Sequence, residues 1–409
     1  MDVSKVAAGI PRSISKFAWS TAHGGYAFIV NFHFAMASTA PQTFTGEVVY
    51  LFAIDVAYEL KRPVPETLLG QSLLPHQVGP AKRSPKQHLF QHLRAARLEP
   101  VQMSSPFGEV LVQRMVKVLP IGAVSIMLRV PYTVSRLEEL SAFHRPAFAQ
   151  EVVHQHLVAL AGSIHAELAP YAVRPAAALP EGEAYTVFCL STPKENQDGA
   201  PFQSEPWFEA NRRDIAAILT LEPDGSLLSQ QEAEESTSQF LSYYRTDLVV
   251  VDWDAALVMD QPADVEETLH VLELANLQLE ELIAYDRLLD AALERSYADL
   301  LHPPKRFSRT TLLQRLREVR IDLARFSDEL SNITKFFGDW HLARLYETVS
   351  RRFHLGDWHR TIDDKLKTLD DLYEMLKQEQ NHRLMVFLEA SIVVMFLIDI
   401  IVLFGGLMK

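Results

Sequence analysis

The amino-acid sequence predicts an α+β fold with three parts: an N-terminal mixed α/β domain, a long helical, coiled-coil-like stalk and one C-terminal transmembrane helix. Up to about residue 262, runs of aromatic and β-branched residues mix irregularly with helical patterns. After Pro262, apolar residues recur with the 4-3 spacing that lines one side of a helix, and the chain ends in a long apolar run. The predicted parts are a flexible N-terminus (1–20), the α+β domain (20–262), a helical bundle or coiled-coil stalk (263–383) and a transmembrane anchor (384–408).

Composition excludes several classes of protein. With 409 residues, of which 48% are hydrophobic, the chain is long enough for a sizeable core and is not a disordered protein. Its net charge of −13 argues against a nucleic-acid-binding surface, so we expect no direct nucleic-acid partner. The single cysteine, Cys189, excludes an internal disulfide and a cysteine-based metal site. No nucleophile elbow, phosphate-binding loop or dinucleotide fingerprint is present, so we expect neither a cofactor nor enzymatic activity.

The first part of the α+β domain is predicted to be rich in strands. Two runs of aromatic and β-branched residues are followed by two more that flank a turn at Pro120 and Gly122, and the last two therefore predict a hairpin. The segment from Pro63 to Pro100 is rich in proline and basic residues and carries no predicted strand. The predicted strands are 26–35, 47–60, 109–118 and 123–130.

The second part of this domain mixes helices and strands. A helical pattern begins at Ser135, where Glu138 completes a capping box, and runs towards Leu168. Three prolines then precede a strand at 185–191, and a short amphipathic helix is predicted at 207–219. Two short strands about the turn Asp252-Trp253-Asp254 end the domain.

Three apolar seams follow Pro262. An antiparallel bundle within one chain and a coiled coil between chains both use the 4-3 spacing, and the sequence leaves both possibilities open. The third seam runs directly towards the C-terminal apolar run. The seams are Leu272, Ala275, Leu279, Leu282, Asp286, Leu289 and Leu293; Leu312, Leu316, Val319, Leu323, Phe326, Leu330, Ile333 and Phe337; and Ile362, Leu366, Leu369, Tyr373 and Leu376.

A four-residue repeat marks the predicted helix breaks. In each copy the glycine is expected to adopt the left-handed conformation that ends a helix, and the aspartate is expected to cap the next helix. Such punctuation explains the repeat without chemistry. The copies are Gly338-Asp339-Trp340-His341 and Gly356-Asp357-Trp358-His359.

The C-terminal run predicts a tail anchor. From Leu384 to Met408 every residue is apolar or small except Glu389 and Asp399, and a helix of this length reaches ~37 Å, enough to cross a bilayer. Basic residues precede the run, and only Lys409 follows it, so the positive-inside rule places the bulk of the chain on the cytoplasmic side. This predicts a single-pass protein of the bacterial inner membrane or, alternatively, a matrix-facing one of the mitochondrial inner membrane. Asp399 is expected to contact a neighbouring helix in a homo-oligomer.

Metal sites are not predicted. Several pairs of histidine or glutamate have helical spacing, but each lacks a third ligand or a convergent partner in the sequence, so we interpret them as exposed helix faces or as helix starts. The pairs are His88 with His92, Glu267 with His270, His341 with His359, and Glu379 with His382.

The second half of the chain resembles a known family, the one named for a requirement in meiotic nuclear division, which has mitochondrial, fungal and bacterial members. The resemblance extends from about Asp247 to Leu403 and includes the stretches Leu272–Asp290, Arg344–Leu366 and Leu369–Leu376. The family has a second glutamate deep in the anchor where this chain has Asp399. The resemblance implies an integral membrane protein that forms homo-oligomers, supports organelle translation in mitochondrial members and has no catalytic residues.

Two functions are therefore expected from the sequence. The first is a tail-anchored, oligomeric scaffold or assembly factor whose α+β domain binds an unknown protein partner. The alternative is an oligomeric ion channel or transporter subunit with the layout of CorA-type magnesium channels and with Asp399 lining the pore, although the Gly-Met-Asn signature of those channels is absent.

Overall fold

The computed structural model describes residues 43–61, 63–76, 93–175, 181–193, 201–222, 224–301, 321 and 340–407. All of them lie in one compact unit, Pro41–Lys409. Several predicted features lie outside the described residues: the N-terminus 1–20, the strand 26–35, the pair His88 and His92, and the second seam from Leu312 to Phe337.

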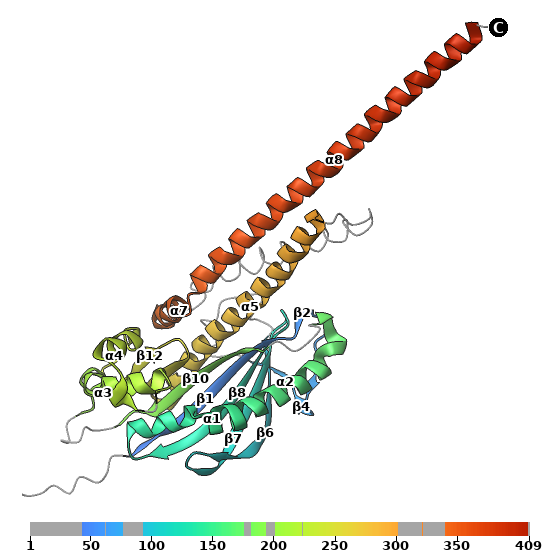
Figure 1. Cartoon of the computed structure of the whole chain (residues 1–409). Coiled ribbons are helices and arrows are strands. Elements are labelled where there is room, and N and C mark those ends of the chain that lie inside the picture. The colour runs from blue at the N-terminus through green and yellow to red at the C-terminus, as the bar shows by residue number, and fades with distance from the viewer. Residues whose placement is uncertain are drawn as a thin grey trace, which may run out of the picture. The chain divides into compact units, whose positions relative to one another are not determined.

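One mixed sheet of nine strands forms the centre of the fold (Figure 1). Its strand order is β11-β12-β13-β10-β1-β8-β7-β6-β5, and every neighbouring pair is antiparallel except β10 and β13, which are parallel. Two small pairs, β2 with β9 and β3 with β4, lie outside it. The strands are β1 Phe44–Asp55, β2 Ala57–Leu60, β3 Thr67–Leu68, β4 Gln71–Ser72, β5 Leu74–Pro75, β6 Arg94–Ser105, β7 Gly108–Val118, β8 Ala123–Val134, β9 Ala172–Pro175, β10 Glu183–Ser191, β11 Phe240–Leu241, β12 Leu248–Val251 and β13 Ala255–Asp260.

Most of the predicted strands are confirmed. The run 47–60 forms β1 and β2, the hairpin forms β7 and β8, the run 185–191 lies in β10, and the turn Asp252–Asp254 joins β12 to β13. Strand β6 was not predicted. Its sequence contains Pro100, and the register of β6 against β7 shifts between Leu98 and Val101, so the proline is accommodated at a bulge.

Strand β1 is paired at both edges, with β8 and β10, and it is buried on both faces because helices cover each side of the sheet. Side chains alternate between the two faces of a strand. Val48, Tyr50 and Phe52 belong to one hydrophobic cluster, whereas Val49 and Leu51 belong to another. A strand that must be apolar on both sides has a nearly continuous hydrophobic sequence, as this one has.

The first face of the sheet is covered by the helices that precede α5. The predicted helix 135–168 is a series of helical segments instead, because Pro146 cannot continue the first one. The capping box at Ser135 and Glu138 is also displaced, since the Ser135 N–H donates to Glu139 Oε2 at 3.0 Å. The segments are η1 Leu137–His144, α1 Pro146–Phe148, η2 Ala149–His154, α2 Gln155–Leu168 and η3 Ala169–Tyr171. They are followed by α3 Ser204–Leu219, η4 Gly225–Leu227 and α4 Gln230–Ser236. Helix α3 confirms the helix expected at 207–219.

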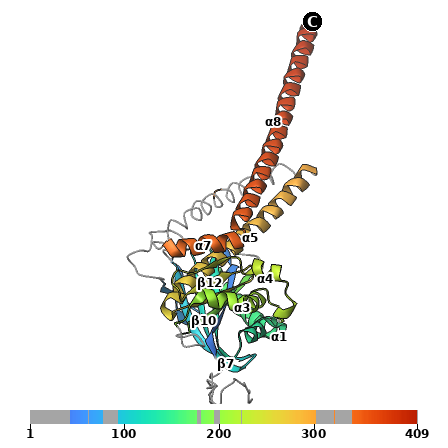
Figure 2. The same ribbon diagram turned by 90° about the vertical axis from the view of Figure 1, so that its left-hand side faces the viewer.

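The opposite face is covered by α5 (Pro262–Leu301), on which α7 (Trp340–Arg352) and α8 (Leu355–Leu407) pack (Figures 1 and 2). Helix α5 contacts β1, β8, β10 and β13 as well as α7 and α8. Residues 271–282 of α5 are all buried. The segment that the sequence assigns to the start of the stalk is therefore the middle layer between the sheet and the last two helices.

The break between α7 and α8 differs from the prediction. The left-handed residue is His354, with φ 51°, whereas Gly356 lies in the first turn of α8 and has no positive φ. The Asp357 N–H donates to the His354 carbonyl at 2.9 Å, and the Asp357 carboxylate contacts His354 Nδ1 at 2.9 Å. The Asp357 side chain, in the first turn of α8, thus stabilises the turn through its contact with His354.

The predicted transmembrane helix is wrong. No helix among the described residues is long and apolar enough to cross a membrane. The expected tail anchor and the single-pass membrane location with its orientation are corrected by the same finding.

Candidate functional site

The register of the third seam continues along α8 beyond the residues that the sequence pattern singled out, first through two polar positions, Gln380 and Arg383. The same 4-3 register that begins at Ile362 reaches a second group of apolar residues near the end of the described side chains. Helix α8 is continuous through both groups (Figure 1). The second group is Phe387, Ala390, Val394, Leu397 and Ile401, and we call it the distal seam.

The first part of the third seam is filled by the chain itself. Ile362 and Leu369 are buried in one cluster with α5 residues, and Leu366 packs against this cluster. The packing of these three residues therefore matches the intramolecular alternative. Tyr373 and Leu376 lie in α8, but their side chains are outside the described residues.

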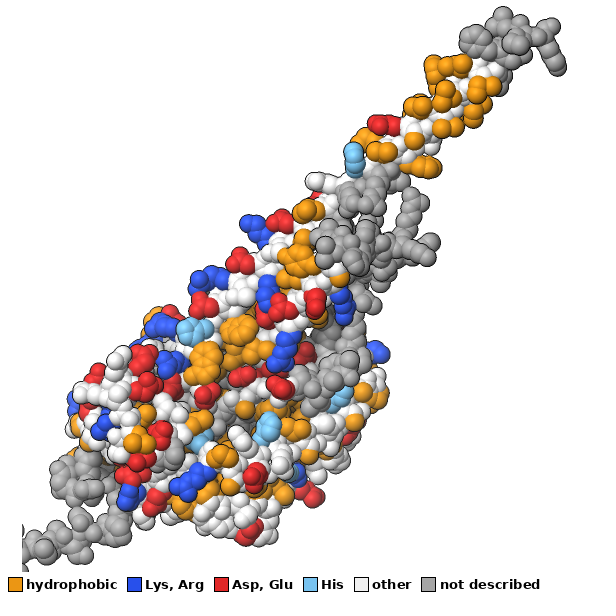
Figure 3. Space-filling model, in the orientation of Figure 1, with side chains coloured by type: hydrophobic (Ala, Val, Ile, Leu, Met, Phe, Trp, Pro, Cys, Tyr) orange, Lys and Arg blue, Asp and Glu red, His pale blue; other side chains and the backbone are white. Residues whose placement is uncertain are grey.

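The distal seam is exposed. Phe387 is 69% exposed, Val394 and Leu397 are each 53% exposed, and Ile401 is 68% exposed. Figure 3 shows hydrophobic side chains gathered on this end of α8. One continuous helix side is thus packed on α5 at its start and uncovered at its end.

The two acids of the apolar run lie away from the distal seam. Each is two residues beyond a seam position, Phe387 or Leu397, and two residues turn a helix by ~200°. Both Glu389 and Asp399 are exposed. The distal seam is therefore an apolar strip without a charge.

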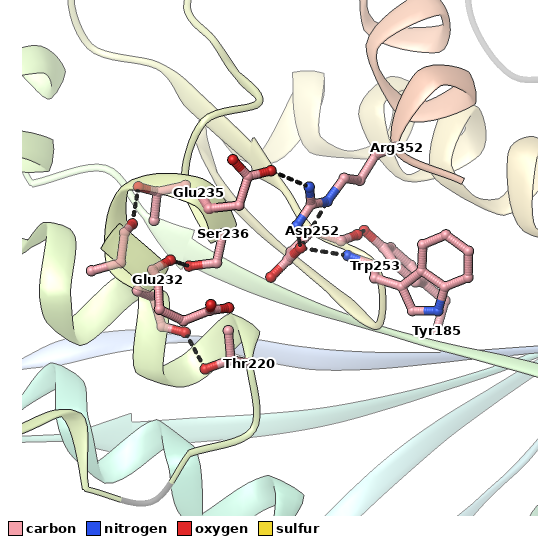
Figure 4. A network of polar contacts seen from close by, with 11 residues as sticks. Tyr185, Thr220, Glu232, Glu235, Ser236, Asp252, Trp253 and Arg352 are labelled. Atoms are coloured by element: carbon pink, nitrogen blue, oxygen red, sulfur yellow. Dashed lines mark hydrogen bonds and ion pairs between the residues drawn. The ribbon is translucent and has the colours of Figure 1, made fainter. Parts of the chain in front are cut away.

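An ion pair between partly exposed Arg352 and the buried Asp252 carboxylate holds α7 against the sheet (Figure 4). Arg352 Nε donates to Asp252 Oδ1 at 2.8 Å, and Arg352 Nη1 donates to Glu235 Oε1 at 3.2 Å. Asp252 is 4% exposed. Burial lowers the pKa of Arg352, but the hydrogen bond to Asp252 and the charge of this carboxylate outweigh burial and raise it. The pair joins the end of α7 to the turn between β12 and β13.

Aromatic contacts support the same junction. The Tyr185 hydroxyl donates to the Asp252 carbonyl at 3.0 Å, and its ring packs edge-on against Phe353 with a centroid distance of 4.9 Å. Trp253 packs against His354 at 5.6 Å. The turn that the sequence placed at Asp252–Asp254 is therefore the place where α7 ends against the sheet.

Side-chain ion pairs as well as apolar contacts hold α8 against α5. Lys365 Nζ contacts Asp286 Oδ1 and Asp290 Oδ1, each at 2.6 Å. Asp286 was a polar exception in the first predicted seam, and the structure explains it as the partner of Lys365.

Helix α5 is in turn fastened to the sheet. Lys117 forms an ion pair with Glu273, and the hydroxyl of Ser125, the cross-strand neighbour of Lys117, donates to Glu273 Oε1 at 2.6 Å. Lys117, Ser125 and Glu273 are buried. Burial alone would raise the pKa of Glu273, but the charge of Lys117 outweighs it and lowers the pKa to about 2. Sequence reasoning missed this group; a lysine inside the predicted strand 109–118 was the available signal.

The structure does not combine the predicted polar repeats into one site. Trp340 is 77% exposed at the start of α7, whereas Trp358 packs against the α5 cluster. Gly338 and Asp339 lie outside the described residues. His270 Nδ1 lies 3.8 Å from Glu273 Oε2, which places it beside a buried ion pair. In the part of the chain that the structure describes, no group of three or more His, Cys, Asp or Glu side chains could hold a metal ion.

Comparisons with known proteins identify the first part of the chain. A family model described as "Uncharacterized protein MJ0711, N-terminal domain" matches residues 45–265, the region from β1 to the start of α5. The protein described as "Uncharacterized protein MJ0711" from Methanocaldococcus jannaschii is 26% identical over 221 residues, which are 54% of this chain and 65% of that protein. The chain thus matches slightly less than two thirds of the length of this relative.

No solved structure matches the chain. The matches do not carry the name of the meiotic nuclear division family, whose resemblance lies mostly beyond the matched residues. They cover the nine-stranded sheet and the helices on its first face. The chain therefore belongs to the family of the MJ0711 N-terminal domain, an uncharacterised domain family.

Proposed function

We propose that this protein is an oligomeric scaffold or assembly factor in which the sheet domain binds a protein partner and α8 joins two copies of the chain. The observation that carries the proposal is the distal seam. Its four large side chains are each more than half exposed although they continue a seam that α5 fills. Exposed apolar strips of this kind are typical of interaction sites.

A second copy of the chain is the partner that fits the distal seam. The 4-3 spacing selects a helix with the same spacing, and two identical helices provide it through a two-fold contact. A helix that packs on the seam leaves Glu389 and Asp399 in water, so pairing costs no burial of these acids.

The free energy gained by burying the distal seam is similar to the cost of association, which favours a reversible dimer. Full burial of a large apolar side chain contributes roughly 1.5–3 kcal/mol, and four half-exposed side chains on each of two helices would contribute roughly 6–12 kcal/mol. Loss of translational and rotational freedom costs about 4–15 kcal/mol. Because the two ranges overlap, we expect association that depends on protein concentration.

The test compares two charge-matched double variants. Val394→Lys with Leu397→Lys places lysines on the distal seam, whereas Ile392→Lys with Met395→Lys places them at the same spacing on the other side of α8. Ile392 and Met395 are 64% and 66% exposed, and Val394 and Leu397 are each 53% exposed, so neither variant disturbs the interior. By sedimentation velocity over a range of concentrations, the seam variant should be monomeric where the parent and the control associate. Equal association of the two variants would contradict the proposal.

The partner class rests on the resemblance to the meiotic nuclear division family, whose mitochondrial members support organelle translation. We infer that the protein partner belongs to the translation apparatus. Purification of the full chain followed by identification of bound proteins tests this inference, with the double seam variant as a comparison. Absence of ribosomal and translation proteins from both preparations would remove the inference and leave self-association unaffected.

The channel alternative is not proposed. It requires a membrane-spanning helix lined by Asp399, and among the described residues no helix meets that requirement.

A further inference from the structure

Four carboxyl groups meet between α5 and one end of the sheet. Asp55 is the last residue of β1, Glu183 is the first residue of β10, and Glu280 and Glu281 are consecutive residues of α5. We call these four side chains the acid cluster. None of them was singled out by the sequence pattern.

The strand register explains why these residues meet. Ala53 pairs with Glu183, and Asp55 is two residues beyond Ala53, so Asp55 and Glu183 point to the same face of the sheet. Ala53 packs with Leu277 of α5, which identifies this face as the one that α5 covers. Glu280 and Glu281 follow Leu277 by three and four residues, so they continue the sheet-facing side of the helix.

The acid cluster is buried and short of hydrogen-bond partners. Glu280 is 1% exposed and Glu281 is 5% exposed, yet Oε1 of Glu281 lies buried without a hydrogen bond. Asn276 is 2% exposed; its Nδ2 donates to the Glu183 carbonyl at 3.1 Å, but its Oδ1 has no donor. An ionised carboxylate in such a place lacks the donors that would stabilise it.

The other charged or titratable groups that face the cluster do not neutralise it. Arg287 of α5 acts on Glu183 and Glu280, whereas Asp254 from the β12–β13 turn adds negative charge near Glu183. Tyr285 lies close to Glu281 and Asp55. The neighbouring cation of α8, Lys365, is engaged by Asp286 and Asp290. Among the described residues, the charge of Arg287 thus acts on two of the four carboxyl groups, whereas no cation acts on Asp55 or Glu281.

We propose that the acid cluster is a proton-operated latch: with its carboxyl groups protonated, α5 packs on the ends of β1 and β10, and loss of these protons drives this part of α5 off the sheet. A proton is the ligand that fits, since the described residues include no group of His, Cys, Asp and Glu side chains with the geometry for a metal ion. The protonated carboxyl groups supply the missing donors, and Asn276 Oδ1 is one available acceptor.

The direction of the pH dependence follows from the same surroundings. Burial raises the pKa of Asp55 and that of Glu183 to about 7, and burial together with nearby carboxylates raises the pKa of Glu280 to about 8. Burial, followed by the charges of Asp55 and Glu280, raises the pKa of Glu281 well above its ordinary value. Because these carboxyl pKa values are higher in the closed state than in the unfolded chain, the closed state is fully favoured at a pH below the unfolded-chain values. It loses stability as the pH rises through about 7 to 8.

Hydrogen exchange of the full chain tests the latch. The exchange rates of residues 273–285, corrected for the intrinsic effect of pH, should rise between about pH 6 and about pH 8.5, by up to ~tenfold per pH unit for each proton released on opening. Glu281→Gln and, separately, Glu280→Gln keep the shape of the side chain and remove its charge, so each should flatten this rise. Glu294→Gln, an exposed position on α5, is the matched control and should follow the parent.

Two further measurements keep the result decisive. The corrected exchange rates of α3 and α4 should not rise with pH as those of residues 273–285 do, because the latch acts on α5 and not on the whole fold. Infrared difference spectra with carbon-labelled glutamate should show protonated carboxyl groups in the parent at neutral pH and fewer in Glu281→Gln.

If either glutamine variant fails to fold, Asp55→Asn takes its place. An unchanged pH profile in the glutamine or asparagine variants, or the absence of protonated carboxyl groups at neutral pH, would overturn the proposal.

Discussion

The Lys117–Glu273 pair illustrates how single residues hold α5 in place. Both side chains are buried, and Ser125 provides a hydrogen bond to the same carboxylate. A buried pair of this kind contributes little net stability compared with an apolar replacement, but removal of one partner leaves an uncompensated charge. A loss of unfolding free energy is therefore expected only when one residue of the pair is replaced without the other.

We predict that Lys117→Met destabilises the protein by roughly 3–5 kcal/mol at neutral pH, because Glu273 remains buried without its cation. The double change Lys117→Met with Glu273→Gln should recover most of this loss. In the parent, the lowered pKa of Glu273 means that its contribution is present above about 4.5 and is lost as the pH falls through about 2. In Lys117→Met the deficit should instead shrink towards acid pH. Urea unfolding across a pH series measures both, and equal stability of the single and double variants would refute the prediction.

Arg352 allows a second test at the scale of single residues. Arg352→Ala should cost about 3 kcal/mol, because it leaves the buried Asp252 carboxylate without its cation. Arg351→Ala, its neighbour with an exposed side chain, should cost less than about 0.5 kcal/mol. Thermal unfolding compares the two variants, and similar losses would show that the Asp252 contact is unimportant.

At the scale of elements, the α7–α8 junction depends on one residue in an unusual conformation. His354 has φ 51°, a region that β-branched residues adopt only with strain. We predict that His354→Val destabilises the junction by about 1–2 kcal/mol, whereas His354→Asn, which tolerates this conformation, costs less. Hydrogen exchange across residues 345–360 localises the effect. Equal exchange in both variants would mean that the backbone conformation is not the constraint.

The elements also show what local sequence can predict. Strands β1, β7, β8 and β10 were predictable because their alternation or continuous apolar character reflects burial along the strand itself. The partner of α5 was not, since 4-3 spacing reports that one side of a helix is covered but does not say whether a sheet or a helix covers it. Lys117 and Glu273 lie on elements far apart in the sequence, and only the sheet register brings them together. The same is true of the acid cluster.

At the scale of the whole molecule, the boundary of the family match and the boundary of the hydrophobic core do not coincide. The match ends at residue 265, at the start of α5, yet Val49, Leu51 and Val258 form one cluster with α5 residues further along. A chain cut at the edge of the match would leave one face of its sheet bare.

We predict that a fragment of residues 43–261 exposes this face and binds a hydrophobic dye, because α5 is missing. A fragment of residues 43–301 should bind less dye, since α5 covers the sheet, but more than the full chain, since α7 and α8 are absent. Dye fluorescence and near-ultraviolet circular dichroism rank the three proteins. A well-packed 43–261 fragment would contradict the prediction.

The central position of β1 also affects how the chain is made. Its two neighbours, β8 and β10, are synthesised long after it, and Gly46 pairs with both Tyr132 and Leu190. Contacts between residues so distant in sequence slow folding, because a long loop must close before they form. During synthesis β1 leaves the ribosome before both neighbours and stays unpaired until β8 and then β10 emerge, and its second face is covered only when α5 follows. Among the strands of the described sheet, β1 is made first and is among the last to be completed, and until then its apolar edges are exposed to association with other chains.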